Sequence, residues 1–211
     1  MIGKYKNMKK LFIALLATFV SVGNVFSQSK VISGGNDHGI LICAEGYIYA
    51  WGSNFSNIGA GPLLGIDPDY PGTTPNEKII YKPQRVKTSG ITFSMVTAGS
   101  GAANIALSCK SIVYAWGDNQ NKECGQGKSA GNVISYPVPV LKGETPGYTE
   151  DGQKGGDYLG DVVYIAANTQ AAFAILGTGE VVGWGTGAWS NGSGEPMYIK
   201  TPDNKRLQNV V

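Results

Sequence analysis

The chain has 211 residues, of which 31 are glycine, 15 % are charged and one is histidine. This composition favours many tight turns over long helices or disorder. The net charge is +2, from 17 basic and 15 acidic residues, but residues 1–27 hold four lysines and no acid, which leaves 13 basic against 15 acidic residues, or −2. That balance argues against a nucleic-acid partner, because no basic excess remains to neutralise phosphates.

Residues 1–27 are predicted to be a secretory signal peptide. Lysines precede the apolar run from Leu11 to Val20, and small or aliphatic residues follow at Val25 and Ser27. This order is typical of an export signal, and the run is too short to span a membrane. The sequence therefore predicts a secreted protein (extracellular, periplasmic or on the cell surface) with no membrane span after signal removal. The alternative is a buried N-terminal strand or helix.

A short phrase recurs through the rest of the chain. Tyr49-Ala50-Trp51-Gly52 returns as Tyr114-Ala115-Trp116-Gly117 and, more loosely, as Val182-Gly183-Trp184-Gly185. The tryptophans therefore stand 65 and 68 residues apart, and self-similarity at a fixed interval indicates a repeated structural unit. We predict that the repeated residues anchor the packing of these units; they are Trp51, Gly52, Trp116, Gly117, Trp184 and Gly185.

Each unit is predicted to contain about four short strands. An apolar run, a tight turn and a β-branched run lead up to the tryptophan, as in residues 105–116. Another strand candidate precedes this hairpin, and Pro-rich extended sequence follows it. Four short antiparallel strands per repeat are typical of a propeller blade. We predict an all-β fold with three such blades at 31–90, 91–160 and 161–206, and the start of a fourth unit at 207–211.

The order of these elements resembles the regulator of chromosome condensation repeat. In particular, Val113-Tyr114-Ala115-Trp116-Gly117 is followed by Asp118-Asn119 and a glycine-rich loop that reaches Gly127. The resemblance covers about residues 31–211 and implies a β-propeller, usually seven-bladed in that family. The sequence is therefore interpreted as an incomplete propeller, truncated from a longer reading frame. Alternatively, a short chain completes its ring with other subunits; in either case further blades are expected.

Two insertions, residues 66–81 and 143–159, interrupt the repeat at equivalent places. Long loops on one rim of a rigid scaffold are common recognition sites, and tyrosine provides rigid amphipathic contact surface. We call these segments the first and second rim loops, and the alternative is that they are solvated loops without a partner. The candidate partner-binding residues are Tyr70, Tyr81, Tyr148, Tyr158 and, outside the repeat pattern, Trp189.

Motifs for chemistry are scarce. His38 is the sole histidine and no nucleophile motif accompanies it, so no catalytic residue, cofactor or metal ligand is assigned. Calcium stays open, with Asp67 and Asp69, or the acidic residues of the second rim loop, as candidate oxygen ligands. Cys43, Cys109 and Cys124 have no metal-binding spacing and are expected to be buried or turn thiols.

These observations predict an exported, non-catalytic binding scaffold whose rim loops hold an extracellular or surface protein or a glycan. The alternative is an extracellular polysaccharide hydrolase or lyase, because the separation of two carboxylates is set by the fold and not by the sequence. The resemblance also implies a third role, guanine-nucleotide exchange on a small GTPase. Export and the mildly acidic exported chain oppose that role.

Overall fold

The computed structural model describes residues 30–55, 61–187 and 190–210. The predicted signal peptide and Trp189 lie outside the described residues. Within the described ranges the chain forms strands and turns and no helix, which confirms the all-β prediction. Consequently, no described helix is long and apolar enough to cross a membrane.

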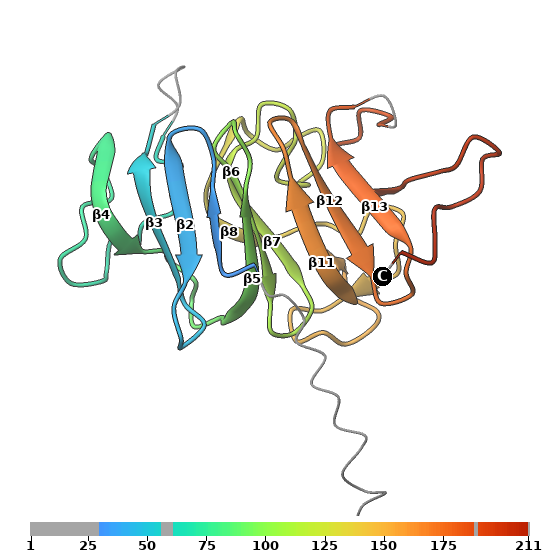
Figure 1. Ribbon diagram of the computed structural model, residues 1–211, viewed down its shortest axis with the longest axis horizontal. Helices are drawn as coiled ribbons and strands as arrows, with labels where there is room; N and C mark the ends of the chain where they lie inside the picture. Colours follow the sequence, from blue (N-terminus) through green and yellow to red (C-terminus); the bar gives the residue numbers. More distant parts are fainter. Residues whose placement is uncertain (1–29, 56–60, 188–189, 211) are drawn as a thin grey trace, which may run out of the picture.

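Three four-stranded antiparallel sheets form three blades that lie side by side (Figure 1). The first blade contains β1 (Ile32–Gly34), β2 (His38–Ile42), β3 (Ile48–Ser53) and β4 (Ile79–Arg85). The second contains β5 (Phe93–Ala98), β6 (Ala103–Ser108), β7 (Val113–Asp118) and β8 (Val133–Pro139). The third contains β11 (Val162–Ala167), β12 (Ala171–Leu176), β13 (Val181–Gly185) and β14 (Met197–Tyr198).

The glycine after each tryptophan is required by the backbone. Gly52, Gly117 and Gly185 have φ values of 106°, 99° and 95°, which side chains with a Cβ rarely adopt. A Cβ on Gly117 would also lie 2.1 Å from the carbonyl oxygen of Ala102. In the first two blades the pairing with the last strand shifts its register at this step, as in a β-bulge. The repeated Trp-Gly pair therefore marks this irregularity in β3 and β7, the third strands of the first two blades.

The core lies between the blades. One cluster joins Ile40, Ile48 and Ala50 of the first blade to Tyr114 and Trp116 of the second. The other joins the second blade to the third, with Met95 and Leu107 packed near Val182 and Trp184. Because successive side chains of a strand point to opposite faces, each blade has two sides. We call the side that carries the tryptophan and faces the preceding blade the rear side, and the opposite side the forward side.

Candidate functional site on the first blade

The three repeated tryptophans have different surroundings. The indole Nε1 of Trp116 donates to the carbonyl oxygen of Leu64 (3.1 Å), and that of Trp184 donates to the carbonyl oxygen of Glu123 (2.7 Å). Both acceptors belong to the loop of the preceding blade, and both indoles are buried. Trp51 is only partly buried, and no carbonyl in the described part of the chain accepts a hydrogen bond from it. Within the described residues, the rear side of the first blade is therefore uncovered.

This open side carries a group of aromatic residues. Tyr47, Tyr49 and Trp51 alternate along β3 and the turn before it, and each is partly buried. The equivalent residues of the second blade, Ile112, Tyr114 and Trp116, are buried under the first blade. Arg85 pairs with Tyr49 across β3 and β4, which places it on the same side.

The first rim loop brings Tyr70 to this group. The Arg85 guanidinium carbon lies 3.7 Å from the centroid of the Tyr47 ring and 4.9 Å from that of Tyr70. A guanidinium at such distances from aromatic rings is attracted by their π-electron density. The structure thus joins Tyr70, one of the predicted contact residues, to Tyr47, Tyr49 and Arg85, which the sequence analysis did not assign to a contact site. We call these four residues the tyrosine–arginine cluster.

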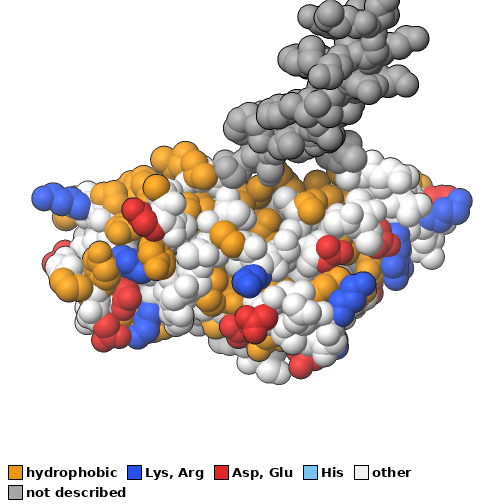
Figure 2. Space-filling view, turned by 90° about the horizontal axis from the view of Figure 1, so that it is seen from below, with side chains coloured by type: hydrophobic (Ala, Val, Ile, Leu, Met, Phe, Trp, Pro, Cys, Tyr) orange, Lys and Arg blue, Asp and Glu red, His pale blue; other side chains and the backbone are white. Residues whose placement is uncertain are grey.

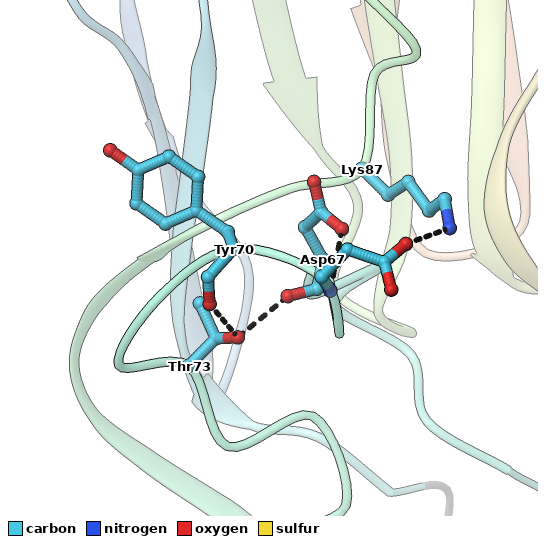
Figure 3. A network of polar contacts seen from close by, with 5 residues as sticks. Asp67, Tyr70, Thr73 and Lys87 are labelled. Atoms are coloured by element: carbon cyan, nitrogen blue, oxygen red, sulfur yellow. Dashed lines mark hydrogen bonds and ion pairs between the residues drawn. The ribbon is translucent and has the colours of Figure 1, made fainter.

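Polar contacts hold the first rim loop in place (Figure 3). The hydroxyl of Thr73 donates to the carbonyl oxygens of Asp67 (2.6 Å) and Tyr70 (2.8 Å), and the Asp69 amide donates to the Asp67 carboxylate (3.1 Å). Lys87 pairs with Asp69 at 2.8 Å, and this hydrogen bond raises the pKa of Lys87. The Tyr70 ring points away from these contacts (Figure 3). The loop is therefore ordered while Tyr70 remains 39 % exposed.

The other predicted contact residues are placed differently. Tyr81 lies in β4 and is 82 % exposed, and Tyr158 is partly buried in the short strand β10 (Tyr158–Leu159). Tyr148, in β9 (Gly147–Tyr148), is buried and packs on Gly160, where a Cβ would come within 2.6 Å of its ring. Burial also raises the pKa of Tyr148. The structure therefore corrects the prediction for Tyr148, whose ring faces the protein and not a partner.

The reason is the fold of the second rim loop. β9 and β10 pair as an antiparallel ribbon, and Tyr148 belongs to the core cluster that holds Ile112 and Tyr114. The hydroxyl of Tyr114 donates to the Glu150 carboxylate at 3.3 Å. Burial, together with the negative charge of Glu150, raises the pKa of Tyr114. This loop folds back onto the second blade and closes over it.

His38 contributes to blade packing. Its Nε2 lies 3.0 Å from the side-chain oxygen of Asn104 in the second blade. The Asn104 amide in turn donates to the carbonyl oxygens of Leu63 (3.3 Å) and Ala102 (3.2 Å). Burial lowers the pKa of His38, against the opposing effects of the Asn104 hydrogen bond and of Asp37. Sequence reasoning missed Asn104. The signal that could have identified it is that Asn104 is polar within the otherwise apolar run 103–107, at the position that pairs with Trp116.

Two cavities lie at the seam between the first and second blades. Asp37 and Asp118 line a polar one of about 150 Å³, beside His38. Cys43, Glu45 and Cys109 line a larger cavity of about 500 Å³. Cys124, the third cysteine, lies elsewhere and is buried, and this burial raises the pKa of its thiol. In the described ranges no three His, Cys, Asp or Glu side chains are grouped so as to hold a metal ion. Figure 2 shows the lower face of the molecule, on which acidic and basic side chains are interspersed.

Comparisons with known proteins agree with this fold. No protein-family model matches the chain. The chain is 28 % identical over 159 residues to the mitochondrial RCC1 domain-containing protein RUG3 of Arabidopsis thaliana, and 26 % identical over 158 residues to the probable E3 ubiquitin-protein ligase HERC3 of Homo sapiens. These matches cover 75 % and 74 % of this chain, but 30 % and 12 % of the relatives. The chain thus spans less than a third of their length.

Solved structures show the same architecture. Human WBSCR16 superposes with a TM-score of 0.56 at 17 % identity, covering 82 % of this chain and 39 % of that one. Prp20p of Saccharomyces cerevisiae superposes with a TM-score of 0.55 at 22 % identity, covering 80 % and 36 %. The fold is thus an incomplete β-propeller, which in general provides a scaffold for protein interaction. The relatives of this chain are thus regulator of chromosome condensation (RCC1) repeat proteins, and its own repeats resemble theirs.

Proposed function

We propose that the chain is an exported, non-catalytic scaffold that holds an extracellular protein or glycan with the first rim loop and the tyrosine–arginine cluster. The observation that carries the proposal is the arrangement of Arg85 between Tyr47 and Tyr70. Aromatic rings and guanidinium groups are the side chains that contribute most to binding energy at interfaces. A loop that is already ordered also loses less conformational entropy when a partner binds.

The order of the first rim loop supports this use. Beyond the Thr73 and Lys87 contacts, the Thr74 amide donates to the Gln84 side-chain oxygen (2.7 Å), and the Gln84 amide donates to the Thr74 hydroxyl (2.8 Å). The loop is therefore joined to β4 along its return path. Export rests on the lysine-rich, apolar N-terminal segment. It is tested separately by N-terminal sequencing of protein recovered outside the cytoplasm, and an intact N-terminus found only inside cells would contradict it.

The binding role is tested with the Tyr70→Ala variant. Purified protein is applied to a glycan array and to immobilised extracellular proteins, and the bound ligands are then titrated. Loss of the ring removes the second aromatic face from Arg85, so affinity should fall about tenfold or more, as for a hot-spot residue. Tyr70→Phe is the matched control, since it keeps the ring and should bind like the wild type. Equal binding by Tyr70→Ala and the wild type would contradict the proposed site.

A further inference from the structure

Basic residues are concentrated on the outer strand of the first blade. β4 is the last strand of its sheet and lies at the edge of the molecule (Figure 1). Residues 78–87 contain four of the 13 basic residues that follow the predicted signal peptide, and they contain no acidic residue. The four are Lys78, Lys82, Arg85 and Lys87. Positive charge therefore follows β4, although the chain after the predicted signal peptide is slightly acidic.

Three of these four residues have no acidic partner. Lys87 pairs with Asp69. Among the described residues, no acidic side chain lies within ion-pair distance of Lys78, Lys82 or Arg85. All 15 acidic residues of the chain are in the described ranges, and the two unpaired lysines are exposed. The charge of these three residues is therefore not neutralised by an acidic side chain of the same chain.

A second arginine stacked on a tyrosine shows what Arg85 lacks. The guanidinium carbon of Arg206 lies 3.6 Å from the centroid of the Tyr198 ring, and its Nη1 donates to the Glu180 carboxylate at 3.0 Å. Arg85 lies over Tyr47 at 3.7 Å without such a carboxylate in the described part of the chain. The planar fork of N–H donors in a guanidinium matches the oxygens of a carboxylate or a similar oxyanion. An anionic group of a ligand would supply the missing acceptor.

Two exposed tyrosine rings accompany these cations. Tyr70 is 39 % exposed and lies beside Arg85, and Tyr81 is 82 % exposed and lies between Lys78 and Lys82 along the chain. A tyrosine ring has flat apolar faces and a polar hydroxyl. The C–H groups on one face of a sugar ring pack on such a surface, while the hydroxyls of the sugar stay in water. The combination of exposed rings and unpaired cations therefore fits a charged sugar chain.

The edge of β4 is a poor template for pairing with a peptide strand. Three residues of β4, 81–83, lie opposite the single residue Trp51, so the strand contains a bulge. In addition, Pro83 has no N–H group to donate. Bulges and prolines at an edge hinder the addition of another strand. The strand therefore presents side chains and not a regular row of backbone groups, which favours a ligand without a peptide backbone.

We propose, on the basis of the proposed function, that the ligand of the first blade is an anionic polysaccharide. Its carboxylate or sulfate groups bind Arg85, Lys82 and Lys78, and its sugar rings pack on Tyr70 and Tyr81. Lys78 and Arg85 are separated by roughly 20 Å of strand, so the ligand spans several sugar units. Blades pack through the faces of their sheets. The edge of an outer strand therefore stays accessible whichever blades adjoin it.

The test is a binding titration of the protein as isolated after expression. The immobilised polymers are polygalacturonate, dextran sulfate, uncharged dextran and polyglutamate. We expect binding to at least one of the two charged polysaccharides and not to dextran, with an affinity that falls as salt rises, because ionic contacts are screened. The tighter of the two identifies the anionic group as carboxylate or sulfate. Binding to neither, or equal binding to dextran, would overturn the proposal, and so would equally tight binding to polyglutamate.

A matched pair of double variants tests the location. Lys78→Gln with Lys82→Gln removes two charges from β4 and should weaken polysaccharide binding about tenfold, because each lysine contributes a charged hydrogen bond. Lys110→Gln with Lys128→Gln removes two exposed charges from the second blade and should bind like the wild type. An equal loss in both variants would overturn the proposal, since binding would then follow only the net charge of the chain.

One outcome separates this inference from the proposed function. Tyr70→Ala removes a ring from the site without changing its charge. If the protein binds an uncharged glycan or a protein, and Tyr70→Ala abolishes that binding, the proposed function stands and the anionic polysaccharide is excluded as the ligand. If the wild type and Tyr70→Ala bind the charged polysaccharide equally, both proposals are contradicted at this site.

Discussion

At the scale of single residues, the contacts that join the first two blades are polar as well as apolar. His38 bonds to Asn104, and Asn104 bonds to the carbonyl oxygen of Leu63. The repeated Trp-Gly pair could be predicted because it stands out at a regular interval. The partner of His38 could not, because Asn104 occupies a position held by glycine in the first blade and alanine in the third. A comparison of the repeats does not identify a residue that occurs in only one of them.

The burial of His38 predicts a dependence of stability on pH. Its pKa is lowered in the folded chain from an ordinary value of 6.5, so between these two values the unfolded chain binds more protons. The free energy of unfolding therefore rises with pH across this window. The contribution of His38 is complete above pH 6.5 and is lost as pH falls through the folded-state pKa.

Urea unfolding at a series of pH values, for the wild type and His38→Gln, measures this contribution. Glutamine can still bond to Asn104 but does not titrate, so the stability difference between the two proteins should change as pH falls below about 6.5. Glu123, whose pKa is raised by burial, is present in both proteins and cancels from the comparison. Parallel stability curves would show that the His38 ring has the same pKa in both states.

At the scale of elements, the two rim loops differ in structure and in their place in the repeat. The first lies between β3 and β4 of the first blade, and the second lies between β8 and β11, where the second blade joins the third. Both interruptions could be predicted from the repeat, but the expectation that they fall at equivalent places was wrong. The direction of each loop could not be predicted, because each carries two tyrosines among turn-forming residues and neither has a clear periodicity. The difference lies in what each tyrosine can cover: Tyr148 packs with buried Ile112 and Tyr114, whereas Tyr70 meets the charged Arg85. An aromatic side chain beside a guanidinium remains partly in water, and one on an apolar surface becomes core.

Replacing Tyr148 by alanine is therefore expected to destabilise the fold. The change removes a buried ring from the core cluster that contains Tyr114, and it should lower the free energy of unfolding by about 3 kcal/mol. Thermal and urea unfolding measure the effect. Tyr81→Ala, at an exposed position of β4, should change stability by no more than about 0.5 kcal/mol. If the two substitutions had equal effects, Tyr148 would not act as a core residue.

At the scale of the whole molecule, stability is unevenly distributed among the blades. The second blade is covered on both sides, and all six residues of β6 and five of the six in β7 are buried. The strands at the two ends of the molecule alternate between buried and partly exposed residues, as β3 and β12 do. The number of blades could be predicted from the tryptophan intervals. Which side of each blade faces its predecessor could not, because that depends on the three-dimensional arrangement of the sheets.

Amide hydrogen exchange, followed by mass spectrometry, measures this distribution. Exchange should be slowest in β6 and β7, because opening the middle blade exposes two interfaces, whereas opening an outer blade exposes one. The short strand β14 should exchange fastest of the third blade. Uniform protection of all three blades would instead indicate that the molecule opens only as a single cooperative unit.

The backward direction of the tryptophan hydrogen bonds also bears on the order of events during synthesis. Leu64 accepts its bond from a residue 52 positions later, and Glu123 from one 61 positions later. The carbonyl of a loop that has left the ribosome therefore receives its indole hydrogen bond only after the next tryptophan has been synthesised. The packing of each of these loops is completed by the blade that follows it. During synthesis, the loop of the blade made last therefore lacks its covering indole until the next repeat has been added.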